Sequence, residues 1–327
     1  MKAIVITAES EPIQLVDLPK PEIKEGHCLV RIKYASLNRR DQWIREGMYP
    51  NIEFGTVLGS DGCGVVEEGS EEWLGKEVIL NPNVNWGIDP AAQSSDYSVL
   101  GMPTNGALAE YIVAPEDRLI EKPTHLTSEE ASAVPLAGLT AYRTVFTKGQ
   151  VGNGMKVLIT GIGGGVAQFA SQFSVALGAE VFVTSGSDNK IAKACSQGVE
   201  AGFNYRNEDW TKDASKVGGF DVIIDSAGGD LLNAYLKLVK PGGRIVVYGS
   251  TTGFPKKMDV FKLFWSQAQI MGSTMGNDLE FEEMVQFVSD HGLKPTIDET
   301  FDLEEYLPAF DRFKSTDHFG KIVLKMN

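Results

Sequence analysis

The sequence predicts an α/β protein that joins a doubly wound parallel sheet to a second, β-rich domain. Three observations support this prediction. The first 120 or so residues show strand-like alternation interrupted by turns. From near Leu126, short apolar strands alternate with helical stretches, which is typical of a parallel sheet. A cluster of glycines stands directly between one of these strands and the helix after it.

The N-terminal part is predicted to form strands and turns. Residues 28–34 (CLVRIKY) alternate apolar and polar side chains, which is the period of a half-buried strand. Residues 59–66 (GSDGCGVV) and 106–114 (GALAEYIVA) predict a tight turn and further strands. Residues 81–105 are rich in Asn, Pro, Gly and Ser and predict a long loop. Loops of that length are usually functional or mobile.

The middle of the chain predicts βαβ units. A helix is expected to begin at Ser128, because the two glutamates after it place negative charge near the helix N-terminus. The predicted strands are residues 156–160, 180–184, 220–225 and 243–248, and the predicted helices are residues 166–177, 188–196 and 230–239. Beyond about Gln267 we expect one more strand from Ile270, two acidic helices and a terminal strand over residues 321–325.

Charge and composition exclude several classes of partner. The 327 residues include 30 Lys and Arg against 44 Asp and Glu, and the net charge of −14 repels nucleic-acid phosphates and anionic lipid. Three widely separated cysteines form no disulfide framework, which favours a reducing compartment. The uncharged stretch 157–179 is long enough to span a bilayer, but its glycines, serines and glutamines favour a turn and a buried helix. We expect a cytoplasmic protein without a signal peptide that binds neither nucleic acid nor membrane.

The most specific motif covers residues 157–173 (VLITGIGGGVAQFASQF). A buried strand ends at Thr160, and an uncharged helix follows a glycine cluster at once. Glycines let the backbone approach a pyrophosphate, whose charge then lies on unpaired N–H groups of the helix, and Ala167 fills the last small position of the dinucleotide fingerprint. The motif predicts a dinucleotide site; the alternative is a glycine turn that only packs two elements. The glycines are Gly161, Gly163, Gly164 and Gly165.

The identity of the dinucleotide depends on the end of the next strand. A site for NAD places Asp or Glu there, where it accepts from the ribose 2′-OH. This chain has Ser185 at that point and offers a cation at Lys190, so the sequence favours NADPH. Asp188 argues against this prediction. For each residue alone, a loop serine and a solvated helix lysine remain the simpler alternative.

Several separated segments also carry a family resemblance: residues 36–50 (SLNRRDQWIREGMYP), 58–71 (LGSDGCGVVEEGSE), 136–145 (LAGLTAYRTV), the glycine turn and 319–324 (FGKIVL). Together they resemble the medium-chain dehydrogenase/reductase superfamily and, within it, the zinc-free quinone-oxidoreductase-like branch. The resemblance implies a β-rich, GroES-like catalytic domain made of residues 1–124 and 267–327. It also implies a Rossmann domain for the dinucleotide over residues 125–266.

The resemblance also sets an expectation about metals. Zinc-dependent members have a Cys at the position matching Asn38, a His at Ser60 and a Cys near Leu136, and this chain has none of these. The loop 81–105 matches the place where zinc-bearing members hold a structural metal on four cysteines, and it contains no cysteine. Zinc prefers thiolate and imidazole ligands, and the four histidines are isolated. We therefore expect no metal.

Without a Lewis acid to polarise an alcohol, the resemblance implies reduction of an already polarised acceptor. Hydride would pass from NADPH to a small-molecule substrate, which is either a quinone or a carbonyl compound, namely an α,β-unsaturated aldehyde or ketone. Asn38, Asp41 and Ser60 are carried over as catalytic residues. Asn38 would donate to the carbonyl, and Asp41 and Ser60 would orient neighbours or pass a proton through water.

Other roles remain open for the residues around this site. Asp41 has the alternative role of capping its own helix, and Asp61 that of stabilising its own turn. Trp43 stands where many members have a Tyr, so no phenolic proton donor is expected there. Arg40 is expected either to meet a substrate oxygen or to pair with the acidic surface.

The predicted cofactor site extends beyond the glycine turn, because ligands of doubly wound sheets bind at the carboxyl ends of the strands. Tyr205 matches a tyrosine near the adenosine phosphate of related reductases, and Lys321 lies in a closing segment that reaches the cofactor pocket. The predicted cofactor-binding residues are Thr140, Gly161, Gly163, Gly164, Gly165, Val166, Ser185, Lys190, Tyr205, Ala227, Tyr248, Gly249, Ser250, Thr274, Met275 and Lys321.

Two rival functions remain open from the sequence. One is an enoyl-thioester reductase, whose carrier would want a basic entry patch that the scattered lysines support weakly. The other is an NADPH-binding protein without turnover, as in lens structural proteins of the zinc-free branch. Relatives commonly dimerise through the edge of the dinucleotide sheet, so we also expect a homodimer in which residues 270–275 supply that edge strand.

Overall fold

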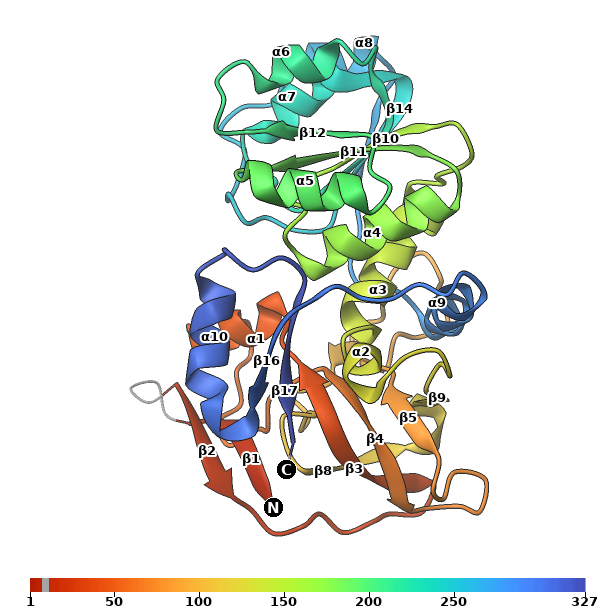
Figure 1. Cartoon of the computed structure of the whole chain (residues 1–327), viewed down its shortest axis with the longest axis vertical. Coiled ribbons are helices and arrows are strands. Elements are labelled where there is room, and N and C mark those ends of the chain that lie inside the picture. Colours follow the sequence, from red (N-terminus) through yellow and green to blue (C-terminus); the bar gives the residue numbers. More distant parts are fainter. Residues whose placement is uncertain (8–11, 327) are drawn as a thin grey trace. The chain divides into compact units, whose positions relative to one another are not determined.

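The chain divides into two compact units (Figure 1). The computed structural model describes residues 1–7 and 12–326. Unit 1 consists of Met1–Leu139 and Gly276–Asn327, and unit 2 of Thr140–Met275. Among the described residues, none of the helices combines the length and the apolar character needed to cross a bilayer.

Unit 2 confirms the predicted doubly wound parallel sheet. Its six strands are all parallel, in the order β12-β11-β10-β13-β14-β15, with helices α4 and α5 on one face and α6, α7 and α8 on the other (Figure 1). This is the 3-2-1-4-5-6 strand order of dinucleotide-binding folds. The elements are η2 (Arg143–Lys148), β10 (Lys156–Ile159), α4 (Gly165–Ala176), β11 (Glu180–Ser185), α5 (Asp188–Ser196), β12 (Ala201–Asn204), α6 (Trp210–Ser215), β13 (Phe220–Asp225), α7 (Leu231–Leu238), β14 (Val239–Val247), α8 (Val260–Trp265) and β15 (Gln269–Gly272).

The strands of unit 2 follow from their apolar runs. A parallel strand that is covered on both faces needs a continuous apolar sequence rather than an alternating one. Val157, Leu158 and Ile159 of β10 are completely buried, and so are Ile223 and Ile224 of β13. The predicted helix 188–196 and strand 220–225 agree with α5 and β13 at both ends.

Unit 1 is built on a seven-stranded sheet in which β3 is central. The sheet runs β16-β17-β3-β4-β5-β9, and β8 pairs with β3 outside this path. The elements are β1 (Lys2–Ile6), β2 (Ile13–Asp17), β3 (His27–Ser36), α1 (Arg39–Arg45), β4 (Asp61–Glu68), β5 (Glu77–Leu80), β6 (Asn83–Val84), β7 (Ser98–Val99), β8 (Tyr111–Pro115), η1 (Glu116–Arg118), β9 (Leu119–Glu121), α2 (Ser128–Ser132), α3 (Pro135–Tyr142, which continues into unit 2), α9 (Asp278–Asp290), β16 (Ile297–Asp302), η3 (Leu303–Glu305), α10 (Tyr306–Lys314) and β17 (Lys321–Lys325).

The observed boundaries of the units differ from the predicted ones at both points where the chain passes from one unit to the other. The sequence placed the inner domain at residues 125–266, whereas unit 2 spans Thr140–Met275. Helix α2 packs against β3 and β4 and therefore belongs to unit 1. At the other crossing, β15 pairs with β14 and completes the parallel sheet of unit 2. Tertiary contacts decide to which unit α2 and β15 belong, and no local pattern in the sequence predicts those contacts.

Candidate functional site

A buried polar cluster lies in unit 1, where four segments distant in sequence meet. The Lys321 ammonium donates to Asn38 Oδ1 at 2.7 Å and to Asp61 Oδ2 at 3.0 Å. Asp61 also accepts from Asn38 Nδ2 at 2.9 Å, from Ser36 Oγ at 2.9 Å and from the Leu136 N–H at 2.8 Å. The cluster is shielded from water, since Lys321 is 3% exposed and Asp61 is fully buried.

The strand order of unit 1 explains why these residues meet. The central strand β3 pairs with β4 on one side and with β17 on the other, and Ser36 at its end pairs in register with both Asp61 and Val323. Gly320 precedes β17 with φ +114°, and a Cβ there would lie 2.2 Å from the Thr296 carbonyl oxygen. A glycine is therefore required where the chain enters β17, and it places Lys321 at the first position of the strand.

Asp41 lies beside this cluster on α1, and the structure shows the capping role that the sequence left open. Its Oδ2 accepts from the Asn38 N–H at 2.8 Å. Its Oδ1 is buried and has no hydrogen-bond partner among the described residues. Burial raises the pKa of Asp41 from 3.8 to about 6, against the opposing effect of the Arg40 charge. A carboxyl group with such a pKa can exchange a proton near neutral pH.

Arg40 and Ser60 form a second buried contact next to the cluster. Arg40 Nη1 donates to Ser60 Oγ at 2.6 Å and to the Leu100 carbonyl oxygen at 2.7 Å. The Ser60 hydroxyl in turn donates to the same Leu100 oxygen at 2.8 Å. Arg40 is 7% exposed and also donates to the Val99 and Met102 carbonyl oxygens. Arg40 thus does not pair with the acidic surface, and its guanidinium is engaged by these acceptors rather than open to a substrate oxygen. The Ser60 hydroxyl is engaged both as donor and as acceptor.

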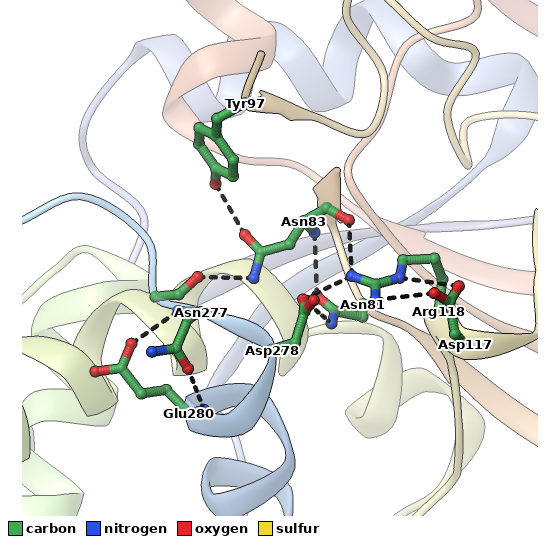
Figure 2. A network of polar contacts seen from close by, with 9 residues as sticks. Asn81, Asn83, Tyr97, Asp117, Arg118, Asn277, Asp278 and Glu280 are labelled. Atoms are coloured by element: carbon green, nitrogen blue, oxygen red, sulfur yellow. Dashed lines mark hydrogen bonds and ion pairs between the residues drawn. The ribbon is translucent and has the colours of Figure 1, made fainter. Parts of the chain in front are cut away.

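Hydrogen bonds tie the loop 81–105 to Arg118 and to the start of α9 (Figure 2). Asn81 Nδ2 and Arg118 Nη1 both donate to Asp278 at the start of α9, at 2.9 and 2.6 Å. Asn83 Nδ2 donates to the Gly276 carbonyl oxygen at 2.7 Å, and the Tyr97 hydroxyl donates to Asn83. The predicted long loop contains the short pair β6 and β7. A cavity of about 820 Å³ borders this network, and its lining does not include Asn38, Asp61 or Lys321.

The glycine turn in unit 2 has the geometry of a phosphate loop. Gly161 has φ +69°, and a Cβ there would lie 2.9 Å from Ser226 Oγ. Gly164 is the N-cap of α4 and makes no side-chain cap, so the N–H groups of the first turn are not capped by a side chain. Gly163, Gly165 and Val166 complete the turn and the helix start. An uncapped twelve-residue helix behind a glycine turn fits a dinucleotide pyrophosphate.

The region predicted for the 2′-phosphate contains a cation that the sequence reasoning missed. Ser185 ends β11, and its carbonyl oxygen accepts from the Tyr205 N–H at 3.0 Å. The Arg206 Nε lies 3.0 Å from where a Cβ on Gly186 would be, so the guanidinium is beside this strand end. Arg206 is exposed and makes no ion pair with any described residue. Asp188, which argued against NADPH, accepts a hydrogen bond from Asn204 Nδ2. Arg206 directly follows Tyr205, so its position in the sequence was the available signal.

The other predicted cofactor residues lie at the ends of β13, β14 and β15 in the same unit. Asp225, at the end of β13, accepts from Thr160 Oγ1 at 2.8 Å, from the Tyr235 hydroxyl and from the N–H of Ala227. Its carbonyl oxygen accepts from the Tyr248 N–H. These bonds tie neighbouring strand ends together. The remaining residues lie beside them: Gly249 and Ser250 follow Tyr248, and Thr274 and Met275 follow β15, with Met275 in contact with Thr140 Oγ1. Lys190 lies in the first turn of α5.

The residues in and beside the polar cluster do not fit a zinc ion. Asn38 and Ser60, the two positions that zinc-dependent relatives fill with Cys and His, each accept a hydrogen bond from a buried cation. Near the third position, Leu136 offers only an N–H. A second cation at this place would be repelled by Lys321 and Arg40 and would find neither thiolate nor imidazole. Across residues 1–7 and 12–326, no group of three or more His, Cys, Asp or Glu side chains could hold a metal ion.

Comparison with known proteins agrees with this architecture. Residues 24–124 match the alcohol dehydrogenase GroES-like domain, and residues 165–290 match the family of zinc-binding dehydrogenases. The zinc-type alcohol dehydrogenase-like protein YogA of Leptosphaeria maculans is 35% identical over 96% of this chain and 95% of its own length. A crotonyl-CoA reductase of Streptomyces avermitilis is 28% identical over 98% of this chain and 84% of its own. The crystal structure of an NAD-dependent alcohol dehydrogenase matches with a TM-score of 0.94 and 34% identity, over all of both chains.

A GroES-like unit and a six-stranded dinucleotide sheet define an oxidoreductase of the medium-chain type. The chain belongs to the medium-chain dehydrogenase/reductase superfamily, in its zinc-binding alcohol dehydrogenase family. A nicotinamide cofactor and a small-molecule substrate are typical of this superfamily. The predicted superfamily is confirmed, whereas the matching family and YogA carry zinc in their names, so the zinc-free quinone-oxidoreductase-like branch stays a prediction.

Proposed function

We propose that this protein is an NADPH-dependent, zinc-independent reductase of quinones or of α,β-unsaturated aldehydes and ketones. The observation that carries the proposal is the buried Lys321–Asp61–Asn38 cluster, which presents proton donors where a metal would need lone pairs. Such a site favours an acceptor whose oxygen gains negative charge as it is reduced. Oxidation of an unactivated alcohol would need a stronger means of removing the hydroxyl proton.

The residues of unit 2 support binding of the cofactor, which supplies the hydride when bound. The N–H groups that follow Gly164 would hold the pyrophosphate on the positive end of α4. Ser185, Tyr205 and Arg206 would hold the 2′-phosphate, since a guanidinium binds phosphate well and Ser185 carries no repelling charge. Arg206 thereby adds a second cation to the predicted Lys190.

The test is NADPH oxidation in the presence of a chelator, with a simple quinone and a short 2-alkenal offered separately. We expect turnover that survives chelation and is much slower with NADH. A preference for NADH would support the proposed reduction but contradict the proposed specificity for NADPH. Turnover of a primary alcohol with NAD⁺ that is lost on chelation and restored by Zn²⁺ would contradict the proposal and favour the activity named for the relatives.

An enoyl-thioester reductase is the second candidate, because this chain is similar to a crotonyl-CoA reductase over nearly its whole length. The two candidate functions differ in whether the conjugated acceptor carries a coenzyme A thioester. Crotonyl-CoA and free crotonaldehyde share the conjugated double bond, so the ratio of their kcat/KM values separates them. NADPH binding without turnover of any of these acceptors would favour a cofactor-binding protein.

We also propose a homodimer formed through unit 2. Strand β15 is the edge of the six-stranded sheet, and among the described residues it pairs with β14 alone. Next to it, α8 exposes Phe261, Phe264 and Trp265 at 59–74%, an apolar surface that a second copy would cover. Light scattering of the wild type should give twice the monomer mass, and the Phe264→Asp variant should give the mass of a single monomer. A wild-type monomer at micromolar concentration would contradict the dimer.

We further propose a cytoplasmic location. Cys28, Cys63 and Cys195 are all free thiols, which suits a reducing compartment. Cell fractionation tests this directly, and recovery from an oxidising compartment would contradict it.

A further inference from the structure

Two buried cations lie in and beside the polar cluster of unit 1, and they differ in how many N–H donors remain without an acceptor. Arg40 directs its guanidinium at Ser60 and at three main-chain carbonyl oxygens. Lys321 carries three N–H donors and uses two of them, on Asn38 and Asp61. Among the described residues no acceptor takes its third N–H. Lys321 is thus a buried cation with one donor available.

The surroundings of Lys321 hold its ammonium in one orientation. Asn38 donates from Nδ2 to Asp61 and accepts at Oδ1 from Lys321, so the amide is fixed at both ends. Asp61 divides its negative charge among three further donors: Ser36, Asn38 and the Leu136 N–H. The carboxylate therefore holds the ammonium in place, but its negative charge is shared with the other three donors.

We propose that Lys321 is the catalytic proton donor of this enzyme, and that Asn38 and Asp61 are its positioning residues. This inference rests on the proposed function. As hydride adds to carbon of the quinone, enal or enone, the acceptor oxygen gains an electron pair, and Lys321 Nζ gives that oxygen its proton. The neutral amine regains a proton from water. The sum is one NADPH, one proton and one acceptor converted to NADP⁺ and the reduced acceptor.

A buried ammonium has the physical properties that this role requires. At 3% exposure its charge acts in a medium of low dielectric constant, where it stabilises a developing oxyanion more strongly than in water. General acids of this kind contribute about 10²- to 10⁴-fold to the rate. The Lys321 ammonium contacts Asn38, the position at which the family resemblance implies a zinc ligand in zinc-dependent members, so one buried cation would replace another.

The test compares Lys321→Met with the pair Lys321→Met/Asp61→Asn, which keeps the fold free of an unpaired buried carboxylate. In each we expect kcat to fall about 100-fold or more, with KM and the NADPH affinity changed less than about threefold. Lys321→Arg should recover part of the loss through its charge. Lys321→Ala should be rescued by added methylammonium, and the wild-type solvent isotope effect on kcat should vanish in Lys321→Met. A matched control is Lys122→Met, since Lys122 is a partly buried lysine of unit 1 that donates to the Leu126 carbonyl oxygen; its kcat should stay unchanged.

A readout without turnover separates this inference from the proposed function. Binding of 4-nitrophenolate, an oxyanion followed by its absorbance, should be about tenfold tighter in the wild type than in the Met/Asn pair. If the wild type reduces no acceptor yet binds the phenolate through Lys321, the proposed function fails, and Lys321 remains a hydrogen-bond donor to a bound oxyanion. Full kcat in the Met/Asn pair, or equal phenolate affinity, would overturn the inference. So would a loss confined to NADPH affinity, which would return Lys321 to the cofactor.

Discussion

The two candidate sites of this protein are built from different parts of the chain. The candidate phosphate loop of unit 2 is one continuous segment, from Gly161 to the start of α4, whose backbone N–H groups would bind the pyrophosphate. The polar cluster of unit 1 is made by side chains from three distant positions, Asn38, Asp61 and Lys321. A site made of backbone tolerates changes in side chains but not in conformation. A site made of buried charges tolerates neither the loss of a partner nor a change of charge.

The largest effect is expected where a buried ion pair is broken. Asp61→Ala would leave Lys321 as an uncompensated buried charge and deprive Ser36 and Asn38 of an acceptor, so we expect a loss of about 3–5 kcal/mol in the free energy of unfolding. Urea denaturation measures it. Asp117→Ala is the control: its carboxylate pairs with Arg118 at 73% exposure, and its removal should cost at most about 1 kcal/mol. Equal losses in the two variants would show that the cluster is not a strongly coupled charged site.

Asp41→Asn tests how much a buried negative charge beside the same cluster lowers the stability of the fold. Because burial raises the pKa of Asp41 from 3.8 to about 6, the folded state binds more protons than the unfolded state between those values. The contribution of Asp41 to stability therefore falls as the pH rises from about 4 to about 6 and is constant above that range. The difference in unfolding free energy between wild type and Asn variant should change by on the order of 2–3 kcal/mol across this window. A difference that is the same at pH 4 and pH 8 would contradict the assignment.

Gly161→Ala probes the backbone site against a matched turn. At φ +69° an alanine costs about 1–2 kcal/mol, and its Cβ would press on Ser226 Oγ. Gly154→Ala has φ +74° with no atom within 4 Å, so it carries the same strain away from the loop. Both variants should lose similar stability, whereas only Gly161→Ala should bind NADPH at least roughly tenfold more weakly, about 1.4 kcal/mol. Equal NADPH affinities in fluorescence titrations would show that the turn does not touch the cofactor.

The smallest effect concerns one exposed side chain. Arg206→Ala should weaken NADPH binding about tenfold and leave NADH binding unchanged, because only NADPH carries the 2′-phosphate. The difference should shrink as salt is added. Lys216→Ala serves as control, since its ammonium already pairs with Asp213 at 2.7 Å. An equal loss for both dinucleotides would place Arg206 elsewhere on the cofactor.

The contrast between the two sites also explains what could be predicted. The strand–glycine–helix pattern of residues 157–173 and the helix at residues 188–196 could be recognised because local sequence specifies backbone conformation. The resemblance pointed to Asn38, Asp41 and Ser60 but not to their partners. For Asp61 the sequence left open a role in its own turn, and the structure makes it the acceptor of four donors. Arg40 was expected at substrate or surface, and it lies buried on main-chain carbonyl oxygens.

Local sequence patterns were thus sufficient for the fold class, the parallel sheet and the glycine turn before α4, since hydrophobic period and glycine conformation act over a few residues. The contact of Lys321 with Asn38 and Asp61, 283 and 260 positions away, depends on β3 lying between β4 and β17. The same holds for the true ends of unit 2, where β15 joins the parallel sheet and α2 does not. Strand order arises from the packing of the whole chain, because burying both faces of a sheet is a property of all its strands together.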